Sequence, residues 1–123
     1  MAQLRYLLDE HLRRALWVAI QQHNRRSPYV VDVLRVGDSP DLPLGSIDPD
    51  ILLWAEREGR ILVSRDRQTL PGHLASHLRA GSHSPGIFLI GAACTIAQVV
   101  DYLALAAYAG DPTDYQDYMT EIR

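Results

Sequence analysis

The sequence predicts an α/β fold of the Rossmann-like kind, in which helices cover both faces of a parallel sheet of about four strands. Short apolar runs alternate along the chain with helical patterns, as in repeated strand–helix–strand units. Two of these runs lead directly into carboxylates, at Asp9 and at Asp66. Open parallel sheets bind ligands at the carboxyl ends of their strands. The sequence therefore predicts an acidic pocket at that edge of the sheet.

Length and composition indicate one compact domain over residues 1–123, which we expect to be cytoplasmic. The apolar fraction is 47%, which argues against disorder. No apolar run approaches the roughly 18 residues of a membrane span, so no membrane partner is expected. Cys94 is the single cysteine and cannot form an internal disulfide, which fits a reducing compartment. We interpret it as a small packing residue.

The charge distribution is uneven and contains no lysine. The net charge is −3, and all 12 fixed positive side chains are arginines, of which eleven lie within residues 1–79. Guanidinium groups pair with phosphates bidentately and stack on bases, which suits a nucleic-acid partner. A compositional bias of a GC-rich genome accounts for the same observation equally well.

The first half of the chain is predicted to form a strand, a helix, a strand and a loop. Their residues are 3–8, 10–23, 29–36 and 37–46. In the helix, apolar residues recur at helical spacing and leave Arg13 and Arg14 on the outer face. The loop is rich in proline and in turn-forming residues.

The second half is predicted to continue the alternation of helix and strand. Asp48 and Pro49 suit an N-cap and a first helical position, and Gly59 suits the end of that helix. Thr95 and Gln98 form a capping-box pattern at the start of the last helix. The remaining predicted elements are a strand at 60–64, a helix at 70–80, a strand at 86–90 and an acidic tail at 111–123 that holds at most one helical turn.

Three carboxylates are the candidates for the acidic pocket: Asp9, Asp48 and Asp66. Asp9 and Asp66 follow strands, and Asp48 opens a helix whose N-terminus we expect at the same edge. Clustered carboxylates raise one another's pKa unless a cation neutralises them, and a divalent metal there activates water for attack on a phosphate. Each acid alone has an ordinary interpretation, as a helix cap or a turn former. Glu10 and Asp50 fit first-turn carboxylates, and Asp38 fits a loop carboxylate.

Histidines form a second, weaker pattern. His73 and His77 have the i, i+4 spacing of a helical metal pair, but no cysteine accompanies them and the H-E-x-x-H form is absent. A solvated helix face is the favoured interpretation. The weaker functional interpretation is that these histidines and the nearby His83 contact a phosphate backbone together with Arg65, Arg67 and Arg79. His73, Arg65 and Arg67 are the substrate-binding candidates among them.

Several nucleotide-binding and phosphatase classes lack their required residues. The chain has neither a dinucleotide-binding nor a P-loop glycine motif. A receiver domain would need a late-strand lysine, which is absent, and a haloacid-dehalogenase-type phosphatase would need an acid where His11 stands. We disfavour all four classes.

The residues resemble the short prokaryotic PIN-like proteins, nuclease-fold domains related to ribonuclease toxins. The matching segments follow in the family's order, at residues 7–10, 48–52, 59–66 and 84–90. The resemblance implies a Rossmann-like sheet and an acidic centre for Mg²⁺ or Mn²⁺. By position, Asp9, Asp48 and Asp66 match the family's acids, with Asp50 and Glu10 as secondary ligands. His11 and Gln68 depart from the family, since they stand where asparagine and a fourth acid are common.

Two functions follow from these expectations. The first is a metal-dependent endoribonuclease, which could be the toxin of a toxin–antitoxin pair, with RNA as substrate and an antitoxin protein as partner. The second is a catalytically silent PIN-like module that acts through a protein partner or as a homodimer. The sequence leaves open the RNA target, the metal count, the oligomeric state and whether Asp48 or Asp50 faces the pocket.

Overall fold

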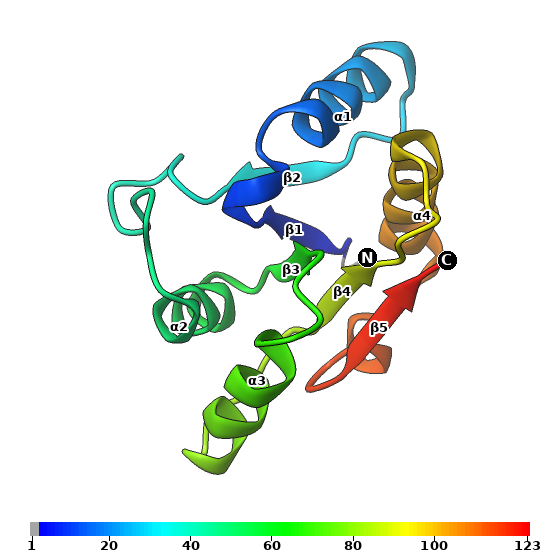
Figure 1. The fold of residues 1–123 in the computed structure, drawn as a ribbon. Coiled ribbons are helices and arrows are strands. Elements are labelled where there is room, and N and C mark those ends of the chain that lie inside the picture. The colour runs from blue at the N-terminus through cyan, green and yellow to red at the C-terminus, as the bar shows by residue number, and fades with distance from the viewer. Residues whose placement is uncertain (1–2) are drawn as a thin grey trace.

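A computed structural model describes residues 3–123 and shows five parallel strands between two layers of helices (Figure 1). The strands occur in the order β2-β1-β3-β4-β5 across the sheet. This α/β architecture is consistent with the predicted Rossmann-like three-layer fold, and its strand order is one of the common doubly wound orders. The strands are β1 Arg5–Leu8, β2 Asp32–Arg35, β3 Ile61–Ser64, β4 Ile87–Ile90 and β5 Met119–Ile122.

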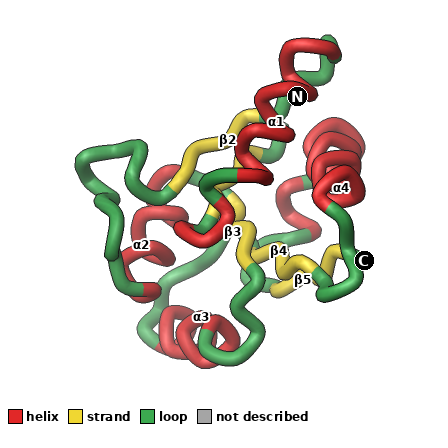
Figure 2. The backbone as a smooth tube through the Cα atoms, turned by 45° about the horizontal axis from the view of Figure 1, so that its top comes forward, coloured by secondary structure: helices red, strands yellow, loops and turns green. Residues whose placement is uncertain are grey.

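Each face of the sheet is covered by two helices. Helices α1, Ala15–Arg26, and α4, Ile96–Ala109, pack on one face, and α2, Asp48–Glu58, and α3, Leu70–Arg79, pack on the other. Figure 2 shows the strands running between these two pairs of helices. Because β1, β3 and β4 are buried on both faces, their side chains form two separate cores that share the sheet.

The predicted helix signals at Gly59 and Thr95 are confirmed. Gly59 ends α2 with the left-handed backbone (φ 67°, ψ 39°) that glycine adopts without steric cost. The Thr95 hydroxyl accepts the Gln98 N–H, and the Gln98 side chain accepts the Thr95 N–H. This reciprocal capping box begins α4 at the predicted residue.

The prediction of four strands and an acidic tail is wrong at the C-terminal end. Residues 119–122 form β5, which pairs in parallel with β4 and fully buries Ile122. Pro112–Asp114 form a 3-10 helix, η2, before it. The sequence signal is weak because an edge strand of four residues with one fully buried side chain has no apolar run of its own.

The first predicted helix is divided into two parts. Glu10–Leu12 form a 3-10 helix, η1, capped by the Asp9 side chain, and α1 begins only at Ala15. Helix α1 then passes the expected break at Asn24 and continues to Arg26. The Asn24 side chain exchanges two hydrogen bonds with the backbone of Val31, which ties the end of the helix to the lead-in of β2.

Two further observations concern membrane spanning and the cysteine. Within residues 3–123, every helix is too short or too polar to cross a bilayer. Cys94 is half-buried, and its thiol donates to the carbonyl of Ile122 at 3.1 Å. This contact joins the loop before α4 to β5.

Candidate functional site at the carboxyl edge of the sheet

The carboxyl ends of β1 and β3 form the topological switch point of the sheet. After β1 the chain crosses one face through α1 to reach β2, and after β3 it crosses the other face through α3 to reach β4. Connections that leave neighbouring strands in opposite directions open a crevice between them, which is where doubly wound sheets bind ligands. Asp9 and Asp66 follow these two strands.

Asp9 is held rigidly at the end of β1. Its side chain is buried, and its backbone N–H donates to the carbonyl of Val63 at 3.0 Å. One carboxylate oxygen accepts the N–H of Glu10 at 2.7 Å, and the other accepts the hydroxyl of Ser64 at 2.7 Å. The carboxylate is therefore fixed by η1 on one side and by β3 on the other.

Ser64 connects the two strand-end acids, and sequence reasoning did not assign it to the site. While its hydroxyl donates to Asp9, the same oxygen accepts the N–H of Asp66 at 3.1 Å. The S-x-D spacing at the end of the third apolar run was the available signal, because a serine hydroxyl can accept the N–H two residues later.

Asp66 is ionised and folded back on its own loop. Its Oδ1 accepts the N–H groups of Gln68 and Thr69 at 3.0 Å each, and its Oδ2 accepts the Thr69 hydroxyl. These hydrogen bonds, above all the one from the Thr69 hydroxyl, lower the pKa of Asp66 below its usual value. Thr69 is a second residue that sequence reasoning did not assign.

Asp48 occupies the first position of α2 and faces the other two acids. The prediction that Asp48 is the N-cap of this helix is wrong, since Ile47 is the N-cap. The Oδ2 of Asp48 lies 3.5 Å from the Thr69 hydroxyl and 3.6 Å from Nε2 of His73. Burial raises the pKa of Asp48, the negative charges of Asp9 and Asp66 raise it further, and His73 opposes them. The three acids therefore share one electrostatic environment.

The carboxylate oxygens of Asp9, Asp48 and Asp66 suit a hard cation, although the three side chains do not lie close together. Mg²⁺ and Mn²⁺ prefer carboxylate oxygens, and a carboxylate has about four lone-pair sites, so each acid retains acceptor capacity. Across residues 3–123, no three His, Cys, Asp or Glu side chains are arranged closely enough to hold a metal ion. A cation bound here would need these side chains to draw together.

The secondary ligands lie farther from the three acids. Glu10 turns toward the loop at 37–46, where its Oε1 accepts the N–H of Gly45 at 2.7 Å. Asp50 is exposed and makes no side-chain hydrogen bond or ion pair within residues 3–123. Of the two acids that open α2, Asp48 is thus the one that faces Asp9 and Asp66.

The predicted substrate-binding residues differ in how they are held. His73 borders the site through Asp48, and Arg65 is exposed after β3. Arg67 is engaged by the protein, since it pairs with Glu121 at 2.7 Å and approaches the carbonyl of Ile90 at 3.5 Å. Arg67 therefore ties the loop after β3 to the end of β5.

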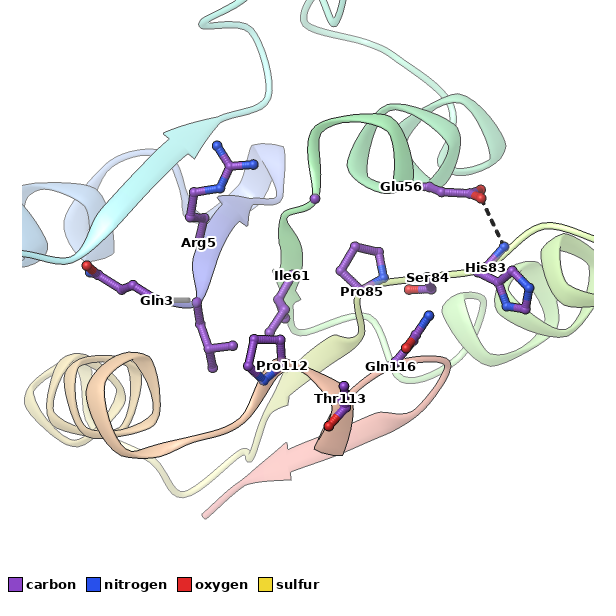
Figure 3. Close-up of a pocket in the computed structure, with 12 residues that line it drawn as sticks. Gln3, Arg5, Glu56, Ile61, His83, Ser84, Pro85, Pro112, Thr113 and Gln116 are labelled. Carbon is purple, nitrogen blue, oxygen red and sulfur yellow. Dashed lines mark hydrogen bonds between the residues drawn. The ribbon is translucent and has the colours of Figure 1, made fainter. Parts of the chain in front are cut away.

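A cavity of about 360 Å³ lies at the opposite, amino edge of the sheet (Figure 3). It opens between the start of β1, the end of α2 and the segment before β5. At its rim the His83 N–H donates to Glu56 at 3.1 Å, and the His83 ring pairs with Asp117 at 3.0 Å. His77 is buried here beside Glu56, so the prediction of a solvated face is wrong at this histidine.

We place the candidate site at the carboxyl edge, because the amino-edge cavity contains none of the predicted site residues, and its Glu56 and His83 are engaged by His77 and Asp117. No protein-family model, curated protein or solved structure matches the chain.

Proposed function

We propose that this protein is a metal-dependent endoribonuclease of the PIN-like kind, in which Asp9, Asp48 and Asp66 bind Mg²⁺ or Mn²⁺. The observation that carries the proposal is the position of these three carboxylates at one edge of the sheet, at its switch point. The raised pKa of Asp48 supports it, because burial and the charges of Asp9 and Asp66 raise that pKa, and a divalent cation would relieve the repulsion among the acids.

The bound cation would polarise a phosphodiester and make a nucleophilic water available near neutral pH. The chain's own residues orient its ligands. Ser64 fixes Asp9 by a hydrogen bond, and Thr69 keeps Asp66 ionised. The exposed guanidinium of Arg65 is available to a phosphate of the substrate, whereas Arg67 would have to leave Glu121 to bind one.

Cleavage of a labelled single-stranded RNA in Mn²⁺ tests this proposal. We expect Asp9→Asn to remove cleavage, because the amide keeps the shape of the side chain but loses its charge. Asp101→Asn, an exposed aspartate on α4, is the matched control and should cleave like the wild type. Activity that survives Asp9→Asn, or that survives EDTA, would contradict the proposed mechanism.

The second candidate is a catalytically silent PIN-like module that binds a protein or a second copy of the chain. It is favoured by the separation of the acids within the described residues and by the exposed apolar side chains of Leu105 and Tyr108 on α4. Titration calorimetry with Mn²⁺ separates the candidates. Heat that disappears in Asp9→Asn supports the nuclease, and no heat in the wild type supports the module.

The toxin role stays a prediction that depends on the nuclease. A toxin of this class is expected beside a gene for a small DNA-binding antitoxin. Co-expression that suppresses RNA cleavage by this chain would support that partner.

A further inference from the structure

Arg13 carries a half-buried guanidinium without a protein partner. Three arginines of the described chain are shielded from solvent: Arg13, Arg35 and Arg60. Arg35 pairs with Asp38 at 3.0 Å, and Arg60 pairs with Asp32 at 2.9 Å. Arg13 makes no side-chain hydrogen bond or ion pair within residues 3–123, and its Nε is buried without an acceptor. A shielded guanidinium without a partner is costly, so an anion bound by its Nη groups would stabilise it.

The backbone around Arg13 is fixed beside Asp9. Arg13 is the C-cap of η1, the same short helix that Asp9 caps at its start, and its N–H donates to Glu10 at 3.4 Å. Its carbonyl accepts Nη1 of Arg35 at 3.3 Å. The sequence predicted an outer helix face at this position, but the division between η1 and α1 turns the residue toward the carboxyl edge instead.

Arg13 lies near the carboxylate of Asp38, but Arg35 makes the hydrogen bonds to that carboxylate. Burial raises the pKa of Asp38, but hydrogen bonds from Arg35 and the charges of Arg35 and Arg13 lower it overall. Both oxygens of Asp38 already accept from Arg35. Asp38 is therefore engaged by Arg35 and leaves Arg13 without a paired carboxylate within residues 3–123.

Gly37 packs against the Leu44 side chain and lies near this guanidinium. The residue has φ 101°, and a Cβ there would lie 2.7 Å from Cδ2 of Leu44 and 3.6 Å from Nη2 of Arg13. A side chain would clash with Leu44 and would cover one donor of the arginine. Gly37 thus places no side chain of its own against Nη2 of Arg13.

We infer that Arg13 binds a backbone phosphate of an RNA strand at the edge of the sheet that carries Asp9. This inference rests on the proposed function for the identity of its ligand. An arginine presents paired N–H donors that match two phosphate oxygens, and its two Nη groups form such a fork. Arg13 would hold the strand, while the acids act on the scissile phosphate.

The test is binding of a fluorescein-labelled single-stranded RNA by anisotropy in EDTA, where cleavage does not interfere. We expect Arg13→Gln to raise Kd about tenfold and to reduce the slope of log K against log salt by about 0.7, the value for one phosphate contact. Arg14→Gln, the exposed neighbour, is the matched control and should stay within about twofold of the wild type. Arg13→Lys, which keeps the charge without the fork, should fall between them.

Failure of this inference can be told apart from failure of the proposed function. Equal Kd values and salt slopes for Arg13→Gln and Arg14→Gln, or no RNA binding by the wild type, would overturn the role of Arg13. RNA binding that depends on Arg13 in a protein that never cleaves would leave this role intact and would reject the nuclease. Thermal unfolding tests whether Arg13 contributes only to packing. Loss of packing alone would lower the Tm of Arg13→Gln without changing the salt slope.

Discussion

The two edges of the sheet differ in how completely their shielded charges are paired. At the amino edge, Arg60 pairs with Asp32, and Glu56 contacts both His77 and His83. At the carboxyl edge, Asp48 faces two like charges, and Arg13 has no partner within the described residues. Both edges carry shielded ionisable groups, but the carboxyl edge pairs Arg35 with Asp38 and leaves Arg13 unpaired within residues 3–123.

This difference separates charges that hold the fold from charges that are available to a ligand. The pairs at the amino edge connect segments that are distant in sequence, such as α2 with the loop before β4. The repulsion of Asp48 by its neighbouring acids and the unpaired guanidinium of Arg13 do not stabilise the free protein. Such features concentrate at binding sites. The comparison therefore predicts that amino-edge substitutions change stability and that carboxyl-edge substitutions change ligand binding.

The largest expected effect belongs to Asp48→Asn at the carboxyl edge. We expect RNA cleavage in Mn²⁺ to fall at least roughly 100-fold, because one charged group at the reacting centre is lost. Asp50→Asn, two residues along the same helix and exposed, should stay near the wild type. Mn²⁺ at ten times its Kd should stabilise the wild type by about 1.4 kcal/mol and should not stabilise Asp48→Asn. Equal losses in both variants would contradict the assignment of Asp48.

The next effect is the loss of stability in Arg60→Met at the amino edge. Arg60 donates to Asp32 at 2.9 Å and to the carbonyl of Tyr6 at 3.0 Å, and the methionine leaves both unpaired. Because Asp32 is partly exposed, we expect the free energy of unfolding in urea to fall by about 2 kcal/mol, below the range for fully buried pairs. Arg57→Met, in an exposed pair, should cost less than about 0.5 kcal/mol. Neither variant should change RNA cleavage relative to its folded fraction.

The smallest effect concerns the exposed pair of His83 and Asp117. The hydrogen bond and charge of Asp117 raise the pKa of His83, and hydrogen bonds from Ser84 and His83 lower the pKa of Asp117. The pair therefore stabilises the fold most between pH 3.8 and 6.5, the usual pKa values of the two groups. The stabilisation is lost as pH rises through the raised pKa of His83 and as pH falls through the lowered pKa of Asp117.

Asp117→Asn tests this pair, because the amide still accepts the Ser84 N–H and asparagine tolerates the left-handed backbone at this position (φ 67°). The Tm of the variant should lie slightly below that of the wild type inside this window and should approach it at alkaline pH. A Tm difference that is constant from pH 4 to pH 9 would show that the ion pair contributes nothing.

Much of the fold follows from local signals in the sequence. The alternation of apolar runs with helical patterns predicted the α/β class, and Gly59 and the Thr95 capping box predicted two helix boundaries. These signals succeed because capping and left-handed turns depend on a few neighbouring residues. Because Asp9 and Asp66 each follow an apolar strand, the sequence also predicted that both acids lie at one edge of the sheet.

The tertiary structure alone decided which of these residues face one another. Strand β5 exists because it pairs with β4, and the folded chain brings Asp48 rather than Asp50 within the electrostatic influence of Asp9 and Asp66. The sequence predicted Arg13 on the outer face of one long helix. Because η1 ends before α1 begins, Arg13 is instead a half-buried guanidinium without a partner in the described residues. Sequence determines what a segment can form, whereas the pairing or isolation of a charge depends on residues that only the folded chain brings together.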